Sequence, residues 1–74
     1  MMNYKDMLIF IEEKSEKKFD SVSLENFKEE LSEIKNGDCI EYEFNNVLFL
    51  IDRNIKSNND ITKDEYIVSV VEDF

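Results

Sequence analysis

The stretch CIEYEFNNVLFLID, residues 39–52, decides the fold. Apolar and polar residues alternate on both sides of an Asn-Asn pair, which is the pattern of two half-buried strands joined by a tight turn. Asn45 and Asn46 tolerate the positive φ angles that a two-residue hairpin turn requires. The predicted strands are therefore 39–44 and 47–52, antiparallel to each other. The register pairs Phe44 with Val47, Tyr42 with Phe49 and Ile40 with Ile51 on one apolar face.

The same register leaves two leucines on the opposite face of the hairpin. Leu48 pairs with Glu43 and Leu50 pairs with Glu41, so that apolar side chains stand among acids. Two explanations stay open. Either a second layer of the domain covers this face, or the leucines form an exposed patch for self-association or for a partner.

A helix is expected at the N-terminal end of the chain, over residues 4–19. Tyr4, Met7, Leu8 and Ile11 recur at the spacing of one helix face. The chain leaves the helix before a polar Asp-Ser pair, which suits a loop.

A second helix is expected to follow, with Ser23 as its N-cap. Val22 and Phe27 are spaced to form a hydrophobic staple across its first turn. The predicted buried stripe consists of Leu24, Phe27, Leu31 and Ile34. Residues 36–37, Asn-Gly, supply the left-handed exit from the helix.

The C-terminal third of the chain is less clear. Residues 54–60 are polar and are predicted to form a loop. The run of Tyr, Ile and Val in 65–73 favours a strand, which would support the hairpin, whereas a capping box at Thr62 and Glu65 fits a helix. We expect the strand, and hence an α+β fold: two N-terminal helices and a three-stranded antiparallel meander in one domain, residues 1–74.

Composition excludes most catalytic chemistry. The chain has eighteen acidic and nine basic residues, a formal net charge of −9, no His, one Cys and one Gly. Acid–base catalysis, zinc sites and phosphate-binding loops rely on residues that are missing or nearly so. No His is present to activate Cys39 as a nucleophile, and a calcium-like start at Asp52 fails because Lys56 and Lys63 take ligand positions. We expect no enzyme activity, no metal and no cofactor.

A lone cysteine suits a reducing cytoplasm, that of the host cell if a phage encodes the chain. The apolar run 7–11 is too short to span a bilayer and is no signal peptide. Negative charge disfavours anionic membranes and nucleic acid as direct partners. We therefore expect a cytoplasmic protein that acts on another protein.

Acids concentrate between residues 23 and 44, where seven acids and two lysines give a net charge of −5. Four lie at helical spacing on the second helix, three of them in a row at i, i+4 and i+8. Two share one side of a strand, about 6.5–7 Å apart. These intervals are similar to the spacing of phosphates along a nucleic-acid strand. The acids are Glu25, Glu29, Glu30, Glu33, Glu41 and Glu43.

These acids, together with Leu48 and Leu50, form the expected partner-binding surface. The expected partner has a basic surface and handles nucleic acid, and the charges would steer association while the leucines anchor it. Reversing Glu29 and Glu33 to Lys is expected to abolish binding. The alternative is a structural or regulatory module, a homodimer or an antitoxin-like subunit, held by the apolar sheet face and insensitive to salt.

In size, charge and lack of catalytic residues, the whole chain resembles the small acidic inhibitors that phages and mobile elements direct against host defence nucleases, including anti-CRISPR proteins. The resemblance implies an inhibitor that mimics nucleic acid. It involves no diagnostic motif, so it assigns no site residue.

Overall fold

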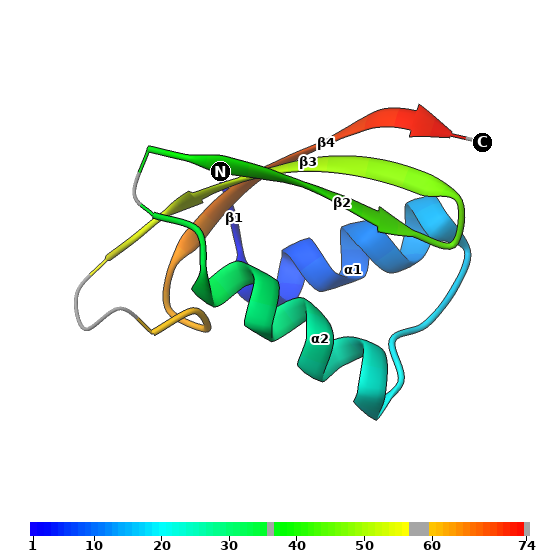
Figure 1. Ribbon diagram of the computed structural model, residues 1–74, viewed down its shortest axis with the longest axis horizontal. Helices are drawn as coiled ribbons and strands as arrows, with labels where there is room; N and C mark the ends of the chain where they lie inside the picture. The colour runs from blue at the N-terminus through cyan, green and yellow to red at the C-terminus, as the bar shows by residue number, and fades with distance from the viewer. Residues whose placement is uncertain (36, 57–59, 74) are drawn as a thin grey trace.

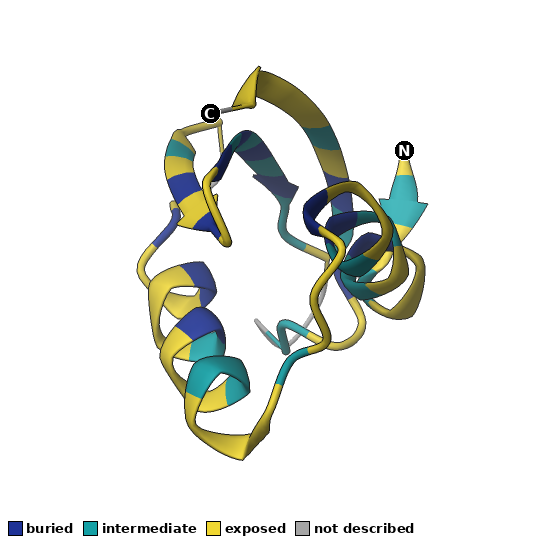
Figure 2. Cartoon of the chain, turned by 90° about the vertical axis from the view of Figure 1, so that its right-hand side faces the viewer, coloured by how far each residue is buried: buried dark blue, intermediate teal, exposed yellow. Residues whose placement is uncertain are grey.

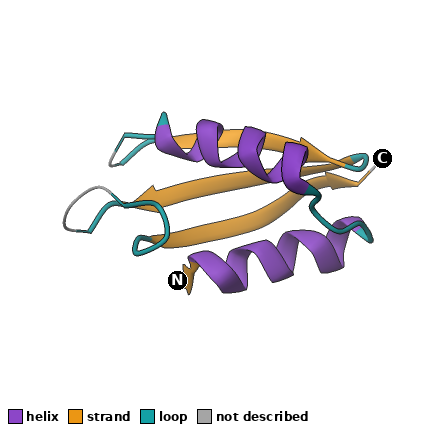
Figure 3. Cartoon of the chain, turned by 90° about the horizontal axis from the view of Figure 1, so that it is seen from below, coloured by secondary structure: helices purple, strands orange, loops and turns teal. Residues whose placement is uncertain are grey.

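Two helices lie on one face of a four-stranded antiparallel sheet in the computed structural model of the chain (Figure 1). The structure describes residues 1–35, 37–56 and 60–73. Seen from below, both helices lie in front of the sheet (Figure 3). The elements are β1 (Met2–Asn3), α1 (Tyr4–Ser15), α2 (Ser21–Ser32), β2 (Cys39–Phe44), β3 (Val47–Asn54) and β4 (Glu65–Asp73).

The β2–β3 hairpin has the register that the sequence predicts. Asn45 and Asn46 adopt φ angles of 49° and 69°, so the turn follows the right-handed twist of the strands. β3 continues two residues past the predicted end at 52, because its last two residues pair with β4. The predicted pairs Phe44–Val47, Tyr42–Phe49, Ile40–Ile51, Glu43–Leu48 and Glu41–Leu50 are all present.

The segment 65–73 is the strand β4, as expected, and the α+β class is confirmed. The prediction of three strands is wrong, because Met2–Asn3 forms a fourth strand against Glu65 and Tyr66. Two residues are too few to leave an alternating pattern in the sequence. The strand order is β1-β4-β3-β2, which makes β2 an edge strand.

α1 ends at Ser15 rather than at the predicted Phe19. Glu16 takes a left-handed conformation with φ 56°, and the Ser15 hydroxyl donates to the Ile11 carbonyl at 2.6 Å. The Glu12 carboxylate accepts the Phe19 backbone N–H at 2.8 Å. These side-chain contacts offer the backbone an alternative to another helical turn, and periodicity alone does not reveal them.

α2 begins at Ser21, and its N-cap is Asp20 rather than the predicted Ser23. The Asp20 carboxylate accepts the Ser23 N–H at 2.8 Å, and the Ser23 hydroxyl accepts the Asp20 N–H at 3.0 Å. This reciprocal pair is a capping box. It places Val22 within the first turn and 69% exposed, so the predicted staple with Phe27 is wrong.

The chain leaves α2 earlier than predicted. The last helical residue is Ser32, and the C-cap Glu33 is right-handed. Gly37 has φ 90° in the following loop, a conformation that glycine adopts without steric cost. Asn36 of the predicted exit lies outside the described residues.

The inner face of the sheet packs against both helices. Phe19, in the loop between the helices, stacks on Phe27 and Phe44 at centroid distances of 5.3 and 4.5 Å, which fastens this loop to the core. Both predicted helix stripes face this core, although Leu24 is only half-buried. The buried apolar residues are Met7, Ile11, Phe27, Leu31, Ile34, Tyr42, Phe44, Val47, Phe49, Ile51 and Tyr66.

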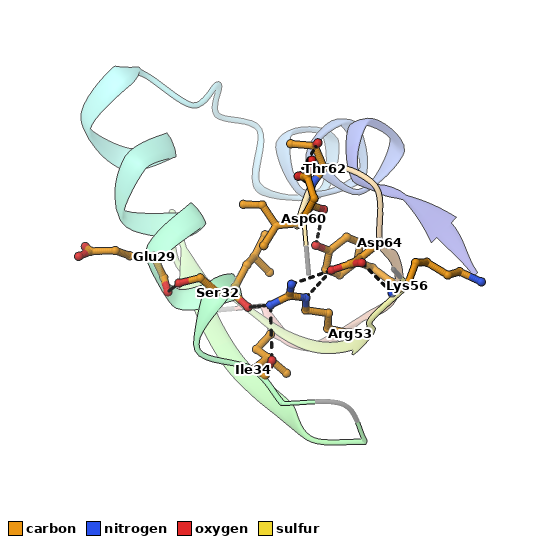
Figure 4. A network of polar contacts seen from close by, with 11 residues as sticks. Glu29, Ser32, Ile34, Arg53, Lys56, Asp60, Thr62 and Asp64 are labelled. Atoms are coloured by element: carbon orange, nitrogen blue, oxygen red, sulfur yellow. Dashed lines mark hydrogen bonds and ion pairs between the residues drawn. The ribbon is translucent and has the colours of Figure 1, made fainter. Parts of the chain in front are cut away.

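An ion pair is buried beneath the sheet (Figure 4). Arg53 Nε donates to Asp64 Oδ2 at 2.7 Å, and Nη2 lies 2.7 Å from the same oxygen in an ion pair. Arg53 Nη1 donates to the Leu31 carbonyl at 2.8 Å, and Asp64 Oδ1 accepts the Lys56 N–H at 2.8 Å. The pair therefore caps the C-terminus of α2 and ties it to β3 and to the loop before β4.

Candidate functional site

The face of the sheet turned away from the helices, here called the outer sheet face, is the strongest candidate site. Figure 2 looks along the strands, with both helices below the sheet and no other described helix above it. Since side chains alternate along each strand, the register of β2, β3 and β4 assigns eleven residues to this face. They are Cys39, Glu41 and Glu43 of β2, Leu48, Leu50, Asp52 and Asn54 of β3, and Glu65, Ile67, Ser69 and Glu72 of β4.

Leu48 and Leu50 occupy the middle of the outer sheet face, because β3 lies between β2 and β4. Leu48 lies between Glu43 and Glu72, and Leu50 lies beside Glu41. Both leucines are half-buried. Within the described chain no second layer covers them, so they leave apolar surface open to a partner.

The outer sheet face continues past the leucines to Asp52 and Ile67, which are cross-strand partners. Ile67 is 54% exposed. Sequence reasoning includes neither residue in the binding surface. Asp52 ends the predicted strand 47–52 and is considered only as a calcium ligand, whereas Ile67 belongs to residues 65–73, which fit a helix as well as a strand. Once this segment is a strand, the burial of Tyr66 assigns its neighbour Ile67 to the opposite face.

Charge on the outer sheet face has one sign. None of its eleven residues is a lysine or arginine. Arg53 of β3 points inward to Asp64, and Lys56 forms an ion pair with Glu65 at the rim. Carboxylates within a Debye length of about 8 Å reinforce one another's potential, so this face fits a basic surface. The five acids are Glu41, Glu43, Asp52, Glu65 and Glu72.

The acids predicted on the second helix lie in the other layer. α2 buries its apolar side beneath the sheet, and Glu25, Glu29 and Glu33 are exposed. Figure 4 shows Glu29 pointing away from the core. Glu30 is exposed as well. Burial raises the pKa of Tyr42 to about 12, and the negative charge of Glu30 is the second cause.

The eight predicted site residues therefore form two groups. Glu41, Glu43, Leu48 and Leu50 lie together on the outer sheet face. The helix group is also partly neutralised, because Lys28 Nζ lies 3.8 Å from Glu25. Within the helix group, partial burial raises the pKa of Glu30, and the negative charge of the nearby Glu33 raises it further.

No described helix is long and apolar enough to cross a membrane. Among residues 1–35, 37–56 and 60–73, no group of three or more His, Cys, Asp and Glu side chains is placed to hold a metal ion. Cys39 is exposed at the start of β2. The expected lack of enzyme activity stays a prediction.

Comparison with protein-family models, with curated proteins and with solved structures finds no match to this chain. A functional proposal therefore rests on the residues and geometry of the chain itself.

Proposed function

We propose that this chain is a non-enzymatic binding protein whose outer sheet face docks on a basic surface of a partner that handles nucleic acid, and that docking inhibits this partner. One observation supports the proposal above the others. The open face of the sheet combines an apolar centre, Leu48 and Leu50, with five carboxylates and no basic residue.

The apolar centre supplies contact area. Protein interfaces commonly have a desolvated apolar core inside a polar rim, and a few central side chains carry most of the binding free energy. Leu48 and Leu50 lie on the central strand with acids across from them on β2, and Ile67 extends the apolar surface toward β1. This arrangement gives anchors at the centre and charges around them.

The carboxylates supply selectivity and rate. Successive outward residues of β2 lie about 6.5–7 Å apart, and neighbouring strands lie about 4.8 Å apart. A groove lined with Lys and Arg to bind phosphates attracts carboxylates through the same Coulomb interaction. Because the sheet fixes the backbone that carries these acids, only their side chains need to be ordered upon binding. Their shared sign accelerates encounter with a basic surface.

The test is affinity capture from a lysate of the host cell, with the intact chain immobilised and the retained proteins identified by mass spectrometry. We expect the main retained protein to be one that binds nucleic acid. Duplex DNA or RNA should displace it, and binding should weaken steeply between about 50 and 200 mM salt. A retained partner that resists both salt and nucleic-acid competition would contradict the proposal.

One observation favours the alternative, a structural or regulatory module such as a homodimer or an antitoxin-like subunit. Ile67, Val70 and Val71 of β4 are 54%, 40% and 52% exposed. β1 pairs only with Glu65 and Tyr66, and an uncovered apolar edge favours pairing with another strand. Sedimentation equilibrium tests the homodimer: a dimer that Val70→Lys dissociates supports it, and a monomer at all concentrations excludes it. For an antitoxin-like subunit, the expected result is capture of a partner whose binding resists salt and is lost with Val70→Lys.

A further inference from the structure

A cavity of about 360 Å³ opens at the end of the outer sheet face that lies beyond the leucines. We propose that this cavity, here called the Asp52 cavity, receives one lysine or arginine side chain of the partner. The inference rests on the proposed function, because it names the chemistry by which the outer sheet face recognises a basic surface. The cavity is lined by Met1, Gly37, Asp38, Asp52, Arg53, Asn54 and Ile67.

The walls of the Asp52 cavity come from three parts of the chain. Asp52 and Ile67 are cross-strand partners on the outer sheet face. Met1 precedes β1 and lies near Asn54, whose Nδ2 is 3.7 Å from the Met1 sulfur. Asp38 belongs to the loop before β2. Apolar surface from Met1 and Ile67 thus stands beside two carboxylates.

This lining matches the chemistry of a long cationic side chain. Lys and Arg bury an aliphatic stem against apolar surface while the charged head keeps polar partners. The volume is near the lower end of the roughly 300–1,000 Å³ range of small-molecule sites, which suits a single side chain. Asp38 and Asp52 form no ion pair within the described chain, so their charges are available to a cation.

The two basic side chains near the Asp52 cavity are already paired with acids, Arg53 with Asp64 and Lys56 with Glu65. Arg53 is 3% exposed, and its guanidinium is held by Asp64 at 2.7 Å. Glu65 lies at the rim of the cavity. Its pKa is lowered mainly by the hydrogen bond and the charge of Lys56, and to a smaller extent by the α-amino group of Met1. Among the described residues, neither basic side chain forms an ion pair with Asp38 or Asp52. The α-amino group of Met1 is the remaining positive charge among the lining residues. Two carboxylates against one amine leave a field in the cavity that favours a cation.

The experiment is an NMR titration of the intact chain with butylguanidinium and butylammonium, using the neutral N-butylacetamide as the matched probe. We expect saturable amide shifts at residues 37–38, 52–54 and 67 for both cations, with weak affinity in the millimolar range. The neutral probe should bind more weakly. No saturable shift at these residues, or equal binding of the neutral probe, would overturn the inference.

Substitutions of single acids test whether the cations bind in the Asp52 cavity. Asp52→Asn and Asp38→Asn should each weaken cation binding about two- to fivefold, the contribution of one exposed ion pair. Glu13→Gln removes the same charge from an exposed position of α1, in the other layer, and should leave the affinity unchanged. An equal loss with Glu13→Gln would show general charge attraction and overturn the inference. Unchanged amide spectra away from the substitution verify that each variant is folded.

The titration and the capture experiment have independent outcomes, so the failure of one inference can be told from the failure of the other. If the cations do not bind while capture yields a salt-sensitive nucleic-acid-binding partner, the Asp52 cavity is wrong and the proposed function stands. If the cations bind as expected while no basic partner is captured, the cavity inference holds and the proposed function is wrong.

Discussion

The two faces of the sheet are built from alternate residues of the same strands, and they differ in how completely their interactions are satisfied. On the inner face Phe49 is fully buried, and even the charge of Arg53 is matched by Asp64. On the outer sheet face Leu48 and Leu50 are only half-buried, and within the described chain only one of its five carboxylates, Glu65, is paired with a base. The inner face therefore carries stability, and the outer sheet face is free to carry binding.

The largest difference in stability between the two faces should be seen when neighbouring residues of β3 are substituted. Phe49→Ala should lower the free energy of unfolding by about 3–5 kcal/mol, because it opens a cavity in the core. Leu48→Ala should cost about 1 kcal/mol or less, since a half-buried side chain loses little. Urea denaturation measures both values. Equal losses would show that the outer sheet face is part of the core after all.

A second test concerns charge on the two faces. Asp64→Asn should lower the free energy of unfolding by about 3 kcal/mol, because it leaves the Arg53 guanidinium buried without its counter-charge. Asp52→Asn makes the same chemical change on the outer sheet face and should change stability by only about 0.5 kcal/mol.

The double variant Arg53→Met with Asp64→Leu provides the control for the buried pair. It removes both charges together and should recover much of the stability that Asp64→Asn loses. If Asp64→Asn is as stable as the parent chain, the pair does not hold α2 to the sheet.

The smallest expected effect is the loss of folding stability at alkaline pH, where buried tyrosines ionise. Burial raises the pKa of Tyr42 to about 12, and it also raises the pKa of Tyr4 and Tyr66. A raised folded-state pKa contributes stability that is complete below the ordinary value of 10.0 and is lost as pH rises through the folded value. Tyrosinate absorbance should therefore appear late and together with unfolding. A simple titration near pH 10 in the folded chain would contradict the burial of these rings.

The sequence predicts most of the fold where short-range chemistry decides it. The Asn45-Asn46 turn sets the register of the hairpin, and that register places Leu48 and Leu50 outward without knowledge of the helices. The N-cap of α2 was assigned to the wrong residue, because Asp20 and Ser23 are both good caps and only their reciprocal bonding decides between them.

Less of the candidate site than of the fold could be predicted from the sequence. Ile67 and Glu72 join it through the pairing of β3 with β4, which includes a register shift between Leu48 and Phe49. Asp52 instead follows Leu48 and Leu50 outward in the hairpin register, opposite Cys39. A pattern of acids along a helix does not tell which layer the helix occupies. For that reason sequence spacing grouped Glu29 with Glu41, which the structure places in different layers.

The most direct test of the account compares two matched charge reversals for affinity toward the captured partner. Glu41→Lys with Glu43→Lys alters the outer sheet face, and Glu29→Lys with Glu33→Lys makes the same change of charge on α2. The first should weaken binding about 100-fold or more, because like charges then face each other across the interface. The second should weaken it only about threefold, through the loss of long-range attraction, rather than abolish it as the spacing of the acids alone predicts. A larger loss from the α2 reversal would contradict the assignment of binding to the outer sheet face.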